Sequence, residues 1–345
     1  MKRLVVCCDG TWNKPDQVCP TNVVRVKNAL AAKDAEGHDQ IAHYVKGVGT
    51  KPRERWIGGG LGVGLSSNVQ DAYRFLVERY EPGDTLYFFG FSRGAFTARS
   101  TAGLVRNAGI LRPEHSGRIE DAYELYRSDD EEDEPGGRNA VKFRADHSYP
   151  DARIHFIGVW DTVGALGMPV GPARPPFISR LWRFHDTTLS SWVDHAYHAV
   201  SIDERRRPFK PTLWVEKEDE APPPEQTVEQ VWFAGVHSDV GGGYPDPSLA
   251  ELPLCWMVAK AEACGLAFQP GWTDRSQDPV VRMNDSLTLA YRLLIPYNRR
   301  LRAAKGVAVK PYVSSSASTR YEQDSKYRPK GLREWLDAAR DVMRL

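Results

Sequence analysis

Cysteine is scarce in this sequence, and its spacing does not indicate a disulfide or metal framework. The 345 residues include five cysteines, an odd number, and no two of them have Cys-x-x-Cys spacing. The thiols are therefore predicted to be reduced, as in a cytoplasmic protein. Cys7 and Cys8 lie within an apolar run, where a packing role is favoured.

Long apolar runs and an excess of one charge are also missing. The apolar run at residues 4–8 is too short for the core of a signal peptide, and no stretch approaches the roughly 20 apolar residues of a membrane span. With 46 basic and 45 acidic residues the net charge is +1, so a nucleic-acid partner is not expected. These absences predict a cytoplasmic protein, although they leave secretion without a signal peptide open.

Short apolar runs are present instead, and helical patterns separate most of them. Such alternation predicts an α/β fold with a mostly parallel sheet, covered by helices on both faces. We expect a single α/β domain over residues 1–345. The predicted strands are 3–9, 41–47, 85–91, 153–161 and 230–237, and the predicted helices are 21–33, 67–80, 92–109, 248–264, 284–303 and 331–344.

Three segments interrupt this alternation. Residues 170–200 are a candidate helical cap insertion, in which Trp182, Phe184 and Trp192 form a candidate acyl pocket; an ordinary pair of packing helices is the alternative. The acidic segment 128–137 is predicted to be a surface loop rather than a metal-binding loop, because blocks of like charge repel one another. The glycine-rich segment 58–67 lacks the Gly-Lys-Ser/Thr ending of a phosphate loop, so it is predicted to be a flexible entrance loop.

The sequence GFSRG, residues 90–94, directly follows the predicted strand 85–91 and precedes a predicted helix. This order is typical of a nucleophile elbow, in which a serine sits on a tight strand-to-helix turn. Gly90 and Gly94 flank the serine where the turn leaves no room for a side chain. The pattern predicts Ser92 as a nucleophile, and a close-packed strand end is the structural alternative.

A serine nucleophile needs a base, and the base needs an orienting acid. In α/β-hydrolases both follow the serine along the chain, in the order acid and then histidine. Asp161 follows the predicted strand 153–161, and His237 follows the predicted strand 230–237. The sequence therefore predicts a triad of Ser92, Asp161 and His237.

Other residues compete for these roles. Asp203 and Asp239 are alternative acids, although Asp239 lies close enough to His237 to shape its loop instead. His195 and His198 have helical spacing within the candidate cap and form a possible metal-binding pair. No clear third ligand accompanies them, so a structural or substrate-facing role is favoured. We expect no metal and no cofactor.

An oxyanion hole requires two backbone N–H donors near the serine. One is expected from Arg93, and the other from Gly10 or Thr11 in the loop after the first predicted strand. Asp9 precedes this loop and is expected to brace it with an Asx-type hydrogen bond. Asp9 as a metal ligand or phosphoryl acceptor is the less favoured alternative.

These residues belong to a set of motifs that resembles a known family. The motifs are CCDGTWN (7–13), TNV (21–23), FFGFSRGAFTAR (88–99), GVWDTVGALG (158–167), YHAVSIDERR (197–206) and WFAGVHSDVGGGY (232–244), followed by YRLLIPYNRR and YRPKGL. Together they resemble the α/β-hydrolase domain of type VI secretion phospholipase effectors and their uncharacterised bacterial and fungal relatives.

The resemblance implies an esterase or phospholipase A activity with Ser92 as nucleophile, Asp161 as acid and His237 as base. A small-molecule or lipid ester is the expected substrate, and peripheral membrane contact is compatible with it. A secretion or immunity partner is expected if the protein is an effector. An amidase or thioesterase using the same triad, and a non-catalytic binding module with this fold, are the alternatives.

Overall fold

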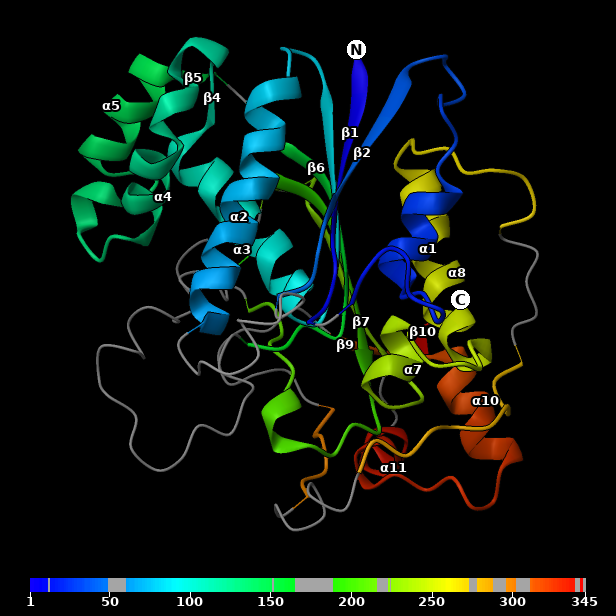
Figure 1. Ribbon diagram of the computed structural model, residues 1–345. Helices are drawn as coiled ribbons and strands as arrows, with labels where there is room; N and C mark the ends of the chain where they lie inside the picture. Colours follow the sequence, from blue (N-terminus) through cyan, green and yellow to red (C-terminus); the bar gives the residue numbers. More distant parts are fainter. Residues whose placement is uncertain are drawn as a thin grey trace.

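One parallel sheet runs through the centre of the computed structural model (Figure 1). The structure describes residues 1–11, 13–48, 60–150, 152–164, 189–215, 223, 225–272, 278–287, 296–301, 311–338 and 342–343. The sheet has eight strands in the order β10-β9-β8-β7-β6-β3-β1-β2. They are β1 (Lys2–Cys8), β2 (Asp39–Val45), β3 (Thr85–Phe91), β6 (Ile154–Trp160), β7 (Val193–Ser201), β8 (Thr227–Phe233), β9 (Pro311–Ser314) and β10 (Val342–Met343). The predicted α/β class is confirmed.

Helices cover both faces of this sheet, because its central strands have apolar side chains on both faces. In β3, Leu86 and Phe88 contact one apolar cluster, whereas Phe89 and Phe91 contact the other. Successive side chains of a strand point to opposite faces, so a continuous apolar run requires cover on each. Helices α2 (Gly60–Arg79), α3 (Arg93–Ala108) and α4 (Ile119–Arg127) pack on the first face, and α1 (Asn22–Ala29) and α8 (Ser248–Ala263) on the second (Figure 1).

Smaller elements complete the described structure. Strands β4 (Ile110–Leu111) and β5 (Ser148–Tyr149) form a separate antiparallel pair. A third apolar cluster joins β7, β8 and β9 to the C-terminal helices. The acidic segment 128–137 is exposed or half-exposed throughout. The remaining elements are η2 (Pro113–Arg118), η3 (Glu131–Asp133), α5 (Arg138–His147), η4 (Arg207–Phe209), α7 (His237–Gly241), α10 (Ser315–Gln323) and α11 (Lys330–Asp337).

The prediction of a helical cap over residues 170–200 is wrong where the structure describes this segment. Its last part is strand β7, which pairs with β6 and β8 inside the sheet. His195 and His198 are three residues apart on this strand, so they point to opposite faces and do not form a helical pair. Residues 165–188, which include Trp182 and Phe184, lie outside the described residues.

The glycine-rich segment is also not a loop where it is described, because α2 begins at residue 60. Burial of Leu65 beside Val48 favours a helix there despite the poor helix propensity of glycine. A Cβ atom on Gly64 would lie 3.1 Å from the Val48 side chain, so a larger residue would crowd this contact.

Two C-terminal helix predictions need correction as well. Residues 284–287 and 296–301, which were predicted to be helical, have no regular structure, and residues 288–295 and 302–303 lie outside the described residues. The predicted helix 331–344 ends early: α11 stops at residue 337, and residues 342–343 form the edge strand β10. Within the part of the chain that the structure describes, every helix is too short or too polar to span a bilayer.

Candidate active site

Ser92 occupies a strained turn between β3 and α3. Its φ of 58° and ψ of −122° lie where residues other than glycine rarely occur. A Cβ atom on Gly90 would lie 2.6 Å from Cα of Ala95, and one on Gly94 would lie 2.2 Å from the carbonyl oxygen of Cys8. Both flanking positions therefore require glycine, as expected for a tight turn.

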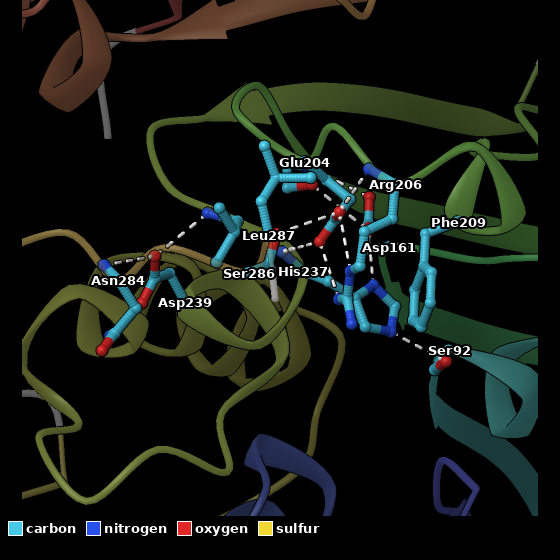
Figure 2. A network of polar contacts seen from close by, with 12 residues as sticks. Ser92, Asp161, Glu204, Arg206, Phe209, His237, Asp239, Asn284, Ser286 and Leu287 are labelled. Carbon is cyan, nitrogen blue, oxygen red and sulfur yellow. Dashed lines mark hydrogen bonds and ion pairs between the residues drawn. The ribbon is translucent and has the colours of Figure 1, made fainter. Parts of the chain in front are cut away.

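The structure brings Ser92, His237 and Asp161 together at the carboxyl ends of the strands (Figure 2). Nε2 of His237 lies 2.8 Å from Oγ of Ser92, and Nδ1 lies 2.6 Å from Oδ2 of Asp161. The carboxylate only accepts hydrogen bonds, so Nδ1 carries the proton and Nε2 accepts from the serine hydroxyl. All three residues are buried. This connectivity is that of a serine nucleophile, its base and an orienting acid.

Asp161 is fully buried and has several donors besides His237. The amide of Ser201 donates to it at 3.0 Å and the hydroxyl of Ser201 at 3.2 Å. The guanidinium of Arg299 contacts both carboxylate oxygens, at 2.5 and 3.1 Å. Burial alone would raise the pKa of Asp161, but Arg299 and His237 outweigh it and hold the pKa well below its usual range. The carboxylate is therefore ionised wherever the protein is folded near neutral pH.

His237 is enclosed by two aromatic rings and anchored through its backbone. The rings of Phe91 and Phe209 lie 4.6 and 4.8 Å from the imidazole. Its amide donates to Oε2 of Glu204 at 3.3 Å, and Arg206 pairs with the same carboxylate (Figure 2). Burial lowers the pKa of His237, although Asp161 opposes the shift. The imidazole is therefore neutral at pH 7 and available as a base.

The loop after β1 lies against Ser92, and the structure narrows the predicted oxyanion donors. The amide of Gly10 donates to Oδ1 of Asp9 at 2.7 Å, so it is already engaged. The amide of Thr11 remains as the candidate from this loop, and that of Arg93 is the first of α3, where intrahelical acceptors are lacking. A Cβ atom on Gly10 would lie 3.2 Å from Cβ of Ser92, so a side chain at this position would crowd the serine.

Asp9 braces this loop from inside the protein. Its Oδ2 accepts hydrogen bonds from the hydroxyls of Thr21 at 2.8 Å and Tyr44 at 2.7 Å. Burial raises the pKa of Asp9 to about 6, although these hydrogen bonds oppose the shift. The side chain therefore joins the loop to α1 and β2, which is the bracing role expected from the sequence.

Comparison with known families adds evidence that is independent of this geometry. Residues 2–260 match the family model described as the type VI secretion phospholipase effector Tle1-like catalytic domain. This chain belongs to that family. The match includes Ser92, Asp161 and His237 but ends before Arg299.

The relatives of this Tle1-like chain are distant and longer. An uncharacterized protein of Saccharomyces cerevisiae, YEL023C, is 29% identical over 230 residues, which is 61% of this chain and 32% of that protein. A crystal structure of an uncharacterized protein from Pseudomonas aeruginosa is 20% identical with a TM-score of 0.46, over 79% of this chain and 47% of that one. The Tle1 effector bound to the VgrG spike of a type VI secretion system is 18% identical with a TM-score of 0.37, over 71% and 52%. The chain thus spans a third to a half of these relatives.

The two alternative acids lie near the triad but make their hydrogen bonds with other residues. Asp203 accepts hydrogen bonds from the amide of Gly235 at 2.7 Å and the hydroxyl of Tyr327 at 2.8 Å. Asp239 accepts from the amide of Val236 at 3.0 Å and also binds Asn284 (Figure 2). Both side chains therefore fix the loop that carries His237, and Asp161 is the carboxylate that contacts its ring.

Trp192 does not belong to an acyl pocket beside Ser92. Its carbonyl accepts a hydrogen bond from Ile154 at the start of β6, whereas Ser92 bonds to Trp160 at the end of that strand. Because a strand rises about 3.3 Å per residue, the two sites are roughly 20 Å apart. The prediction of an acyl pocket is wrong for Trp192, because this residue directly precedes strand β7 instead of lying in a helical cap.

Three buried polar residues at the site were not predicted from the sequence. They are Arg299, Ser201 and Glu204. Ser201 and Glu204 lie within the motif at 197–206, and Arg299 lies within the motif YRLLIPYNRR. The motifs therefore carried a signal for these positions, but no local pattern connects Arg299 with Asp161, 138 residues away.

Proposed function

We propose that the chain is a serine carboxylic-ester hydrolase of the lipase or phospholipase A type, formed by a single domain over residues 1–345. The observation that carries this proposal is the continuous hydrogen-bonded path from Ser92 through His237 to Asp161. Membership of the Tle1-like catalytic family supports it. The strained backbone of Ser92 supports it further, because such strain clusters at active sites.

In the proposed acylation step, Nε2 of His237 removes the proton of the Ser92 hydroxyl while Oγ attacks the ester carbonyl carbon. The carbonyl oxygen becomes an oxyanion, which the amides of Arg93 and Thr11 stabilise. The tetrahedral intermediate then collapses, and His237 donates its proton to the departing alcohol. The acyl group remains on Ser92.

In the proposed deacylation step, a water molecule replaces the alcohol. His237 removes a proton from this water, and the resulting hydroxide attacks the acyl carbon. Collapse of the second intermediate breaks the bond to Oγ, which recovers a proton from His237, and the carboxylic acid departs. Asp161 stays ionised throughout and stabilises the imidazolium that forms in each step. Arg299 keeps this carboxylate charged and correctly oriented.

We propose a phospholipid as the substrate class, because the matching family model is described as the catalytic domain of phospholipase effectors. A lipid substrate also entails contact with a membrane surface. Amides and thioesters are the alternative substrates of the same chemistry, and they differ from esters in the leaving group that His237 must protonate.

Ser92→Ala tests the proposal. Removing the nucleophile of a triad lowers kcat by roughly 10⁴ to 10⁶-fold, and the variant should no longer react with a fluorophosphonate probe. Turnover of p-nitrophenyl esters, phosphatidylcholine and matched amides then identifies the bond that is cleaved. Ser100→Ala is the control, because Ser100 is a buried serine further along α3. Labelling that survives in Ser92→Ala, or that is absent from the unaltered protein, would overturn the proposal.

A further inference from the structure

A second cluster of reactive side chains lies at the other end of the sheet, where β6 and β7 begin. His155 is on β6, His195 is on β7, and Cys264 directly follows α8. One ligand atom from each of the three residues lies within 4.8 Å of the others. His155 is the second residue of β6 and Asp161 directly follows its last residue, so the two are roughly 20 Å apart at about 3.3 Å per residue. The cluster is therefore separate from the proposed active site.

His155 is oriented as a metal-binding histidine would be. Its Nδ1 lies 3.3 Å from Oδ2 of Asp194, and its Nε2 lies 3.2 Å from the carbonyl oxygen of Cys264. Nδ1 thus contacts a carboxylate, and a metal ion at Nε2 would replace the contact of this nitrogen with the carbonyl oxygen. Histidines that bind metals commonly donate their second N–H to a carboxylate in this way.

His195 completes the pair and has an unsatisfied nitrogen. Its ring is perpendicular to that of His155, with 5.0 Å between the ring centroids. Its Nδ1 is buried and has no hydrogen-bond partner among the residues that the structure describes. A neutral imidazole has one nitrogen that carries a lone pair and no proton, so this atom is available as a ligand.

The thiol of Cys264 is the third candidate ligand, and it lies on the turn that directly follows α8. A bound cation would displace the thiol proton, because a thiol that coordinates a metal is deprotonated.

We propose that His155, His195 and Cys264 bind one zinc ion, with a water molecule as the fourth ligand. Two imidazoles and a thiolate suit zinc, whereas magnesium and calcium require oxygen ligands. Tetrahedral zinc holds nitrogen at about 2.0–2.1 Å and sulfur at about 2.3 Å, so the three half-buried side chains close around the ion by small rotations. The ion ties the starts of β6 and β7 to the end of α8.

Cobalt is the probe that reports this ligand set directly. The full chain is stripped of metal with a chelator, exchanged into metal-free buffer and titrated with CoCl₂ and then ZnCl₂. A thiolate-to-cobalt charge-transfer band should appear at one equivalent and disappear when zinc displaces cobalt. Cys264→Ser should abolish the band, and His195→Asn should weaken cobalt binding. Cys19→Ser should retain both signals, because Cys19 is a half-exposed thiol outside the cluster.

Two further measurements guard against a variant that merely misfolds. In the Cys19→Ser background, the other three cysteines besides Cys264 are buried, so zinc should slow the reaction of one thiol with a disulfide reagent. Asp194→Asn, which alters the contact behind His155 and the ion pair of Asp194 with Arg153, should weaken zinc binding about 10–100-fold; Arg153→Gln, which alters the ion pair and keeps the carboxylate, should leave zinc binding unchanged. No charge-transfer band in the unaltered protein, or a band that persists in Cys264→Ser, would overturn the proposal.

Discussion

One buried polar group at each end of the central sheet shows how differently the two ends are built. At the carboxyl ends of the strands, Asp161 is enclosed by donors from His237, Ser201 and Arg299. At the amino ends of β6 and β7, a buried nitrogen of His195 has no partner within the described chain. The first arrangement fixes one geometry and one protonation state, as a preorganised active site requires. The second retains the capacity to bind an additional group.

Removing Arg299 should break the first arrangement with the largest effect. Arg299→Met leaves the carboxylate of Asp161 buried without its cation, and breaking a buried pair in this way costs about 3–5 kcal/mol. The uncompensated charge of Asp161 should also raise the pKa of His237, so the acid limb of kcat/KM should move to higher pH. Urea unfolding measures the first effect, and a pH profile of ester hydrolysis measures the second.

Arg320→Met is the matched control for this substitution. Arg320 is equally buried but donates to the carbonyls of Pro279 and Val281. Its loss should lower the free energy of unfolding without moving the acid limb. Arg299→Lys keeps a charge beside Asp161 and should fold even if Arg299→Met does not. An acid limb that is identical in the unaltered protein and both Arg299 variants would contradict the assignment.

Gly94→Ala should disturb the same end of the sheet through packing alone. Its Cβ atom would lie 2.2 Å from the carbonyl oxygen of Cys8 and 2.5 Å from that of Asp9, so backbone must move. Overpacking of this kind costs about 1–3 kcal/mol, and a displacement of about 1 Å at the site can cost 10²-fold in rate. Thermal unfolding and ester hydrolysis measure both effects. Gly117→Ala, which has open space around it, is the control, and equal losses in the two variants would refute this explanation.

The enclosure of His237 should be visible in the pH dependence of hydrolysis. Burial lowers the pKa of this imidazole from 6.5, and only its neutral form accepts the serine proton. Activity should therefore persist as pH falls through 6.5 and decline only at lower pH, where His237 becomes protonated. The acid limb of kcat/KM gives this pKa for the free enzyme. A midpoint above 6.5 would be inconsistent with an imidazole that is neutral because it is buried.

The smallest expected effect concerns the hydrogen bonds by which Asp9 holds the loop after β1. Tyr44→Phe removes one hydrogen bond to Asp9, which should lower the free energy of unfolding by about 1 kcal/mol. The loop after β1 should loosen, so kcat should fall severalfold with little change in KM. Tyr149→Phe on β5 should leave kcat unchanged, and the same loss of kcat in both variants would argue against a role for the brace.

The sequence predicted those parts of the fold that local patterns determine. Apolar runs identified β1, β3, β6 and β8, because strands buried on both faces carry few polar residues. The residues at their carboxyl ends followed from this, and so did the proximity of Ser92, Asp161 and His237. The proposed catalytic roles remain predictions that the variants above test.

The features that the sequence missed depend on tertiary contacts. Strand β7 carries Asp194, His195 and His198, and these polar residues conceal a central strand in the sequence. Arg299 resembles any surface arginine in sequence, since only the folded chain brings it to Asp161. Likewise, His155, His195 and Cys264 lie on separate elements, and no spacing in the sequence connects them.

Arg299 lies outside the region that matches the family, yet it contacts Asp161. The family match stops at residue 260, yet the cation that neutralises Asp161 and the strand β9 that covers the edge of β8 both come later. A chain shortened to the matched region would keep all three proposed catalytic side chains. It would also expose a sheet edge and leave a negative charge unbalanced in its interior, so we expect a stable chain to include Arg299 and β9.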